Sequence, residues 1–122
     1  MLIRYVLWDL EGSNTTIEEL RTYLREESVG AFSDVRGLRF KAWFSDAATN
    51  RWGAVYLWES SEHAQQRLPS RAREIIGKDP EVVDFFAVEA TAEGVYDVAA
   101  LSRRGLAFEE PDTSATVEKG VT

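Results

Sequence analysis

The stretch "RWGAVYLWES", residues 51–60, decides how the fold of this chain is interpreted. Trp52, Ala54, Tyr56 and Trp58 recur at every second position, and glycine, valine and leucine fill the positions between them. Alternate side chains of a β-strand point to opposite faces of a sheet. A strand here is therefore apolar on both faces, whereas a half-buried strand normally has one polar face. The pattern predicts a sheet that is covered on both sides.

The residues around this stretch predict a β-α-β-β-α-β order. A capping box at Thr15 or Thr16 begins the first helix, and the turn "DAATN" joins the two middle strands as a hairpin. Pro69 makes the second helix either kink or restart, because the residue before a proline is pushed out of helical geometry. The predicted elements are strands over 2–10, 35–46, 51–59 and 81–90, helices over 15–28 and 60–77, and a short helix within 93–105.

This order is that of the ferredoxin-like fold of the α+β class, in which two helices cover one face of a four-stranded antiparallel sheet. We expect one domain over residues 1–108, which includes a short C-terminal helical appendage. Residues 109–122 are polar and contain a proline, and we expect them to form a disordered tail.

Composition excludes several classes of function. The net charge of −7 disfavours a nucleic-acid partner, which needs a basic surface. The chain has no cysteine and a single histidine, so we expect no metal site. It has no apolar run long enough to cross a membrane, and its first residues are too short and too charged for a signal peptide. We expect a cytoplasmic protein.

The sequence also suggests which residues lie on each face of the predicted sheet. We expect Leu38, Phe40, Phe44, Val55 and Leu57 to face the helices. The opposite, open face would then carry the larger aromatic and cationic residues, which are Arg39, Lys41, Trp43, Trp52, Tyr56 and Trp58, with Trp8 from the first strand and Asp84 and Phe86 from the fourth. Five aromatic side chains left in water would forgo about 15 kcal/mol of burial. We therefore expect a homodimer that packs sheet against sheet and encloses an aromatic pocket. Alternatively, the aromatic residues form only the dimer core.

The segments "GLRFKAWFSD" and "GAVYLWESSEHA" resemble the YdhR-like monooxygenases of the dimeric α/β-barrel superfamily. The matching positions are Gly37, Lys41, Trp43, Gly53, Tyr56, Leu57 and Trp58. The resemblance implies a dimeric α/β barrel and a cofactor-independent monooxygenase. Some members of the superfamily bind haem through a histidine late in the second helix. This chain has Arg71, Ala72 and Arg73 there, which disfavours haem.

A cofactor-independent oxygenase needs a substrate whose anion reacts with O₂. A small aromatic or polyketide-like substrate would suit the pocket, with Lys41 or Arg39 stabilising its anion and Tyr56 donating a hydrogen bond. His63 and Asp84 are the candidate bases, although His63 also fits an exposed position in a first helical turn. The predicted substrate-binding residues are Arg39, Trp43, Trp52, Trp58, Phe86 and Trp8. A polyketide cyclase or isomerase and a non-catalytic binding dimer remain alternatives.

Overall fold

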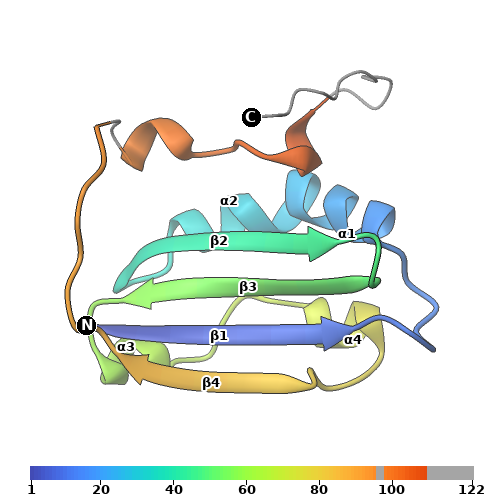
Figure 1. Ribbon diagram of the computed structural model, residues 1–122, viewed down its shortest axis with the longest axis horizontal. Helices are drawn as coiled ribbons and strands as arrows, with labels where there is room; N and C mark the ends of the chain where they lie inside the picture. The colour runs from blue at the N-terminus through green and yellow to red at the C-terminus, as the bar shows by residue number, and fades with distance from the viewer. Residues whose placement is uncertain (96–97, 110–122) are drawn as a thin grey trace.

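The computed structural model describes residues 1–95 and 98–109, so the expected disordered tail lies almost wholly outside the described residues. Four antiparallel strands form one sheet in the order β2-β3-β1-β4 (Figure 1). The strands are β1 (Leu2–Asp9), β2 (Leu38–Asp46), β3 (Arg51–Trp58) and β4 (Val82–Ala87). This mixed α+β arrangement is compatible with the predicted ferredoxin-like fold.

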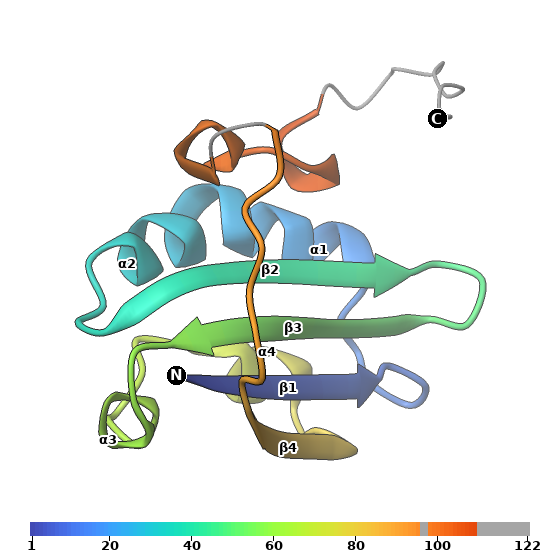
Figure 2. The same cartoon turned by 60° about the vertical axis from the view of Figure 1, so that its left-hand side comes forward.

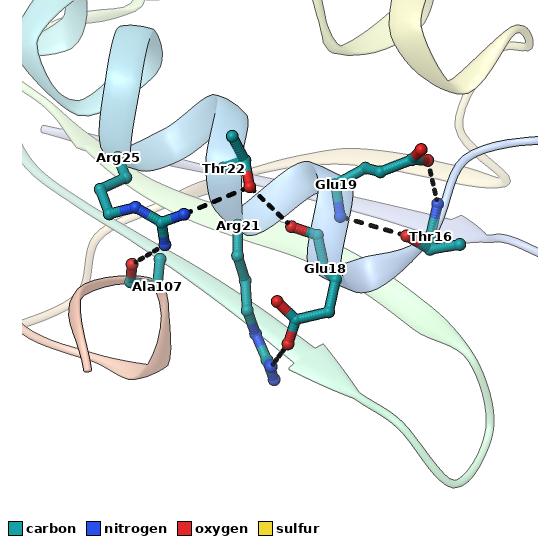
Figure 3. A network of polar contacts seen from close by, with 7 residues as sticks. All are labelled: Thr16, Glu18, Glu19, Arg21, Thr22, Arg25 and Ala107. Atoms are coloured by element: carbon teal, nitrogen blue, oxygen red, sulfur yellow. Dashed lines mark hydrogen bonds and ion pairs between the residues drawn. The ribbon is translucent and has the colours of Figure 1, made fainter. Parts of the chain in front are cut away.

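The first helical region is longer than predicted and contains a π-helical turn. It runs through α1 (Ile17–Tyr23), η1 (Leu24–Ser28) and α2 (Val29–Ser33). The capping box predicted from the sequence begins it: the Glu19 backbone N–H donates to Thr16 Oγ1 over 3.1 Å, and the Thr16 N–H donates to the Glu19 carboxylate over 3.0 Å (Figure 3).

The second helical region is interrupted around Pro69, as the sequence predicts. It consists of α3 (Ser61–Ala64), capped by Ser60, and α4 (Ala72–Ile76). Buried residues of these short helices and of the first helical region belong to one core with β1 and β3. The helices therefore cover a single face of the sheet (Figures 1 and 2).

The predicted orientation of the sheet is wrong for most of its residues. Trp52, Tyr56 and Trp58 lie under the helices and are between 0 and 5% exposed. Phe40 and Phe44, which we expected under the helices, point to the other side and are each 37% exposed. The large aromatic residues thus fill the core of the chain itself, because the short helices leave a wide space that indole and phenol rings fill well.

An irregularity in β2 changes which of its residues face the helices. Its register with β3 shifts between Leu38 and Phe40, a β-bulge that changes which alternate residues share a face. Leu38 is paired with Trp58 and Lys41 with Tyr56, so both lie on the helix side. Only Leu38 among the five residues expected to face the helices does so.

The opposite face carries no helix, and we call it the open face. Its residues follow from the strand register and are Ile3, Tyr5, Leu7 and Asp9 of β1, Phe40, Ala42, Phe44 and Asp46 of β2, Arg51, Gly53, Val55 and Leu57 of β3, and Val82, Asp84 and Phe86 of β4. Phe44 stacks on Tyr5 across Gly53, where a Cβ atom would lie 2.5 Å from the Phe44 ring. Asp9, Asp46 and Arg51 form a charged group at one end of this face, and Asp84 is the only charged residue among the others, which are mostly apolar.

Candidate functional site

A cavity of about 700 Å³ lies along β2, the edge strand beside the first helical region. Its walls are β2, the α1–α2 region and residues 98–108, which we call the C-terminal segment. This segment contains the 3₁₀ turns η2 (Val98–Leu101) and η3 (Leu106–Phe108). Only η2 lies within 93–105, where the sequence predicts a short helix, and it is a single 3₁₀ turn. Figures 1 and 2 show the segment, in orange to red, running alongside α1 and α2.

A hydrogen bond from Arg25 of η1, together with apolar packing, holds the C-terminal segment in place. Arg25 Nη1 donates to the Ala107 carbonyl oxygen over 2.5 Å, and Arg25 Nη2 donates to Thr22 Oγ1 over 3.2 Å (Figure 3). Ala107 is buried and Phe108 packs against the core. The segment is therefore an integral wall of the cavity.

Replacing Arg25 by methionine should loosen this wall. A hydrogen bond to a charged group contributes about 1.5–3 kcal/mol, and methionine retains the apolar stem without the donor. We expect urea denaturation to show a loss of about 1–2 kcal/mol and trypsin to cleave faster after Arg103 and Arg104. Arg67→Met, at an exposed position, is the matched control. Unchanged cleavage in Arg25→Met would show that the contact does not anchor the segment.

Lys41 is the most unusual group of the cavity. Its Nζ lies 3.3 Å from the ring centroid of Phe32, 4.2 Å from that of Tyr56 and 4.3 Å from that of Trp43. These three rings form an aromatic cage, in which each ring face attracts a cation. Within residues 1–95 and 98–109, no carboxylate lies within 4.0 Å of Lys41. The cage is thus a site for an ammonium group that has no ionic partner.

The surroundings of the cage favour the neutral amine. Burial, with the positive charge of Arg4 as a second cause, holds the pKa of Lys41 well below its usual range. Burial also raises the pKa of Tyr56, against a smaller opposing effect of Arg4, whose guanidinium carbon lies 4.9 Å from the Tyr56 ring centroid. The amine of Lys41 is therefore unprotonated at a lower pH than that of an ordinary lysine, and in this form it can accept a proton from a substrate.

A second, much smaller void of about 20 Å³ lies deeper, between the sheet and the first helical region. Lys41, Trp43 and Trp52 contribute to the walls of both spaces. Ser28, in the π-helical turn, lines the small void, and its buried Oγ has no hydrogen-bond partner in the described part of the chain. Lys41 thus lies between the cavity and the small void that contains Ser28.

The structure brings some of the predicted site residues together at the cavity. Arg39, Lys41, Trp43 and Trp52 line it, and Tyr56 reaches it only through the cage around Lys41. Trp8 lines only the small void, where its Nε1 donates to the Lys78 carbonyl oxygen over 3.0 Å.

Other predicted residues lie elsewhere. Trp58 is fully buried and stacks on Tyr56, with its Nε1 lacking a partner in the described part of the chain, and it lines neither space. His63 Nδ1 lies 2.9 Å from Ser60 Oγ, and its ring packs against Gly37. Asp84 and Phe86 are on the open face. Neither candidate base, His63 or Asp84, is therefore at the cavity.

Sequence reasoning missed the residues that close the cavity. Phe32 completes the cage from α2, and Arg103 and Arg104 enter the wall from the C-terminal segment. The signal in the sequence is the stretch "ALSRRGLAF", in which apolar residues lie on both sides of the two arginines. The apolar residues indicate that this segment packs against the domain.

The chain matches no protein-family model, and no curated protein shows significant similarity to it. Among the described residues, no helix is long and apolar enough to span a bilayer. The same residues contain no group of three or more histidine, cysteine or acidic side chains that could hold a metal ion.

Proposed function

We propose that the protein is a cofactor-independent monooxygenase of the ferredoxin-like, dimeric α/β-barrel type, which acts on a small aromatic or polyketide-like substrate in the cavity. The observation that carries this proposal is Lys41, a desolvated amine at the wall of an aromatic-lined cavity, without an ionic partner among the described residues. A desolvated amine without an ionic partner costs stability, and such groups are typical of functional sites.

In this proposal Lys41 is the general base, in place of His63 and Asp84, the candidates from the sequence. Its neutral amine takes the proton of a substrate phenol or enol, and the resulting ammonium remains beside the substrate anion. The ring faces of Phe32, Trp43 and Tyr56 stabilise that ammonium. One side chain thus generates the anion and then balances its charge.

The anion then reacts with O₂. For an anthrone, the net change converts the ring CH₂ into a carbonyl: one oxygen atom enters the product, and the other leaves as water with the two hydrogens of the CH₂. The substrate supplies all the electrons. The protein's part is to favour the anion and to keep water away, which Trp43 and Trp52 help to do at the cavity wall.

Oxygen uptake tests the proposed reaction. Purified protein is incubated with anthrones, naphthols and hydroquinones under ¹⁸O₂ without added cofactor, with an electrode reading and mass spectrometry of the products. We expect protein-dependent uptake and one ¹⁸O atom in the product. A product formed without uptake would instead support a cyclase or isomerase. Binding without turnover would support a binding protein.

Lys41→Met should lower the rate by about 100-fold or more, because it removes the general base. The wild-type rate should rise with pH through the lowered pKa of Lys41 and then level off, and the variant should lack this rise. Lys78→Met, which removes only an exposed ion pair to Glu81, is the matched control. A variant that retained the same rise would contradict the assignment.

The same variant should not lose stability. A lysine whose pKa is lowered in the folded state reduces stability at neutral pH, and this reduction disappears as the pH rises toward the unfolded value. Lys41→Met should therefore be at least as stable as the wild type at pH 7, as thermal unfolding would show. Lost activity in a stable variant separates catalysis from folding.

We also propose that the chain is a homodimer through the open face, whose uncovered apolar residues are typical of an interface. In contrast to the sequence-based expectation, the interface would contain Phe40, Phe44, Leu57 and Phe86, and the large indoles would lie outside it. Phe40 and Phe44 also line the cavity, so the second copy would approach one end of it.

A further inference from the structure

The cavity has a charge opposite to that of the chain. Its lining includes four arginines, which are Arg21, Arg39, Arg103 and Arg104, beside Lys41, and no acidic side chain among the described residues that line it. The whole chain carries a net charge of −7. Cations collected around a cavity in an acidic protein focus a positive potential into it. Such a potential favours an anionic ligand.

These cations differ in whether they already have an ionic partner. Arg21 pairs with Glu18 and Arg39 pairs with Glu59, each over 2.8 Å and both near the surface. Arg103 and Arg104 have no carboxylate within 4.0 Å anywhere in residues 1–95 and 98–109. Among the described residues, no carboxylate therefore competes with a ligand for these two arginines.

The backbone and contacts of Arg103 show how this arginine enters the wall. Arg103 has φ of 60°, in the left-handed region that costs a residue with a side chain about 1 kcal/mol or more. Its Nη2 lies over Gly30 of α2, within 3.6 Å of where a Cβ atom of that glycine would be. The side chain thus crosses from the C-terminal segment to α2 beside the cavity.

We propose that the substrate is an aromatic carboxylate, whose carboxylate group is held by Arg103 and Arg104 while its ionisable oxygen faces Lys41. This inference rests on the proposed use of the cavity and adds the chemical class of its ligand. Two guanidinium groups suit a carboxylate, which each can bind through two parallel hydrogen bonds. The arginines enter from the C-terminal segment and Lys41 from β2, so the two polar ends of the ligand meet different walls.

A pair of matched ligands tests the inference. 2-Naphthoate and 2-naphthamide share ring and shape, and only the first is charged at pH 7. Isothermal titration should show that the naphthoate binds about ten-fold or more tightly than the amide, and that added salt removes much of the difference. Equal affinities, or a preference for the amide, would overturn the proposal.

Variants then locate the carboxylate. Arg103→Gln, Arg104→Gln and the double variant should lower naphthoate affinity toward that of the amide and leave the amide unchanged, whereas Arg67→Gln should change neither. A preference for the naphthoate that survives the double variant would place the anion elsewhere and refute the assignment. Equal losses for both ligands in variants whose circular dichroism matches the wild type would also refute it, because the arginines would then not distinguish the charge.

These outcomes separate the inference from the reaction itself. Oxygen uptake by uncharged anthrones, with no preference for the naphthoate, would refute the carboxylate and leave the monooxygenase intact. Preference for the naphthoate without oxygen uptake from hydroxynaphthoates would refute the monooxygenase and leave the ligand class intact.

Discussion

Replacing Gly37 by alanine is expected to lower the free energy of unfolding by about 2–5 kcal/mol. Gly37 has φ of 82°, and a side chain in this left-handed conformation costs about 1–2 kcal/mol. An added Cβ atom would also overlap the ring of His63. Overpacking of this kind costs about 1–3 kcal/mol. The neighbouring backbone cannot easily yield, because the Gly37 carbonyl oxygen accepts from the Glu59 N–H over 2.8 Å.

Gly12→Ala is the matched control, because Gly12 has nearly the same φ of 83° and no atom within 4 Å of the place where a methyl group would lie. Chemical denaturation should show only the backbone cost there, about 1–2 kcal/mol. Adding His63→Ala to Gly37→Ala should recover the part of the loss caused by the ring. Equal losses for the two glycine variants would show that His63 does not press on Gly37.

This contact assigns His63 a structural role. Its ring lies against the backbone where β2 begins, and its Nδ1 is close to Ser60 Oγ at the start of α3. The sequence placed His63 correctly in the first turn of a helix, and it offered a choice between the surface and the pocket. What decided the outcome is a long-range contact with a glycine in a left-handed conformation, which periodicity does not reveal.

The order of elements was predictable because its signals are local. The Thr16 capping box and the interruption around Pro69 act over a few residues, and hydrophobic periodicity identifies the strands. The predicted boundaries of β3 agree within one residue, whereas the first helical region extends five residues further than expected. Nothing in "LREESVG" signals that the helix continues through a π-helical turn.

The face that packs on the helices was not predictable in the same way. Periodicity sorts the residues of β3 into two sets and does not say which set is buried when both are apolar. The bulge in β2 adds a change of phase that the sequence does not announce. The cavity depends on the return of residues 98–108 to α1, a contact between segments about 80 residues apart in sequence. Short-range patterns contain no information on such a contact.

Phe86→Asp is expected to convert the proposed dimer into a monomer. Phe86 lies on the open face and is 53% exposed in the single chain. An interface with two-fold symmetry receives two copies of every substitution, so the variant would bury two carboxylates among apolar side chains. Burying an unpaired charge costs several kcal/mol, which corresponds to an increase of about 100-fold or more in the dimer dissociation constant.

The chain offers a close control for this variant in the adjacent residue. Phe85 belongs to the same strand, is 50% exposed and points to the helix side of the sheet. Phe85→Asp introduces the same charge at nearly the same place in the sequence, and sedimentation velocity at several concentrations should show it still dimeric. A wild-type monomer at every concentration would refute the dimer. Dissociation of Phe85→Asp in place of Phe86→Asp would show that a second copy uses the other side of β4, because only the direction of the side chain distinguishes the two variants.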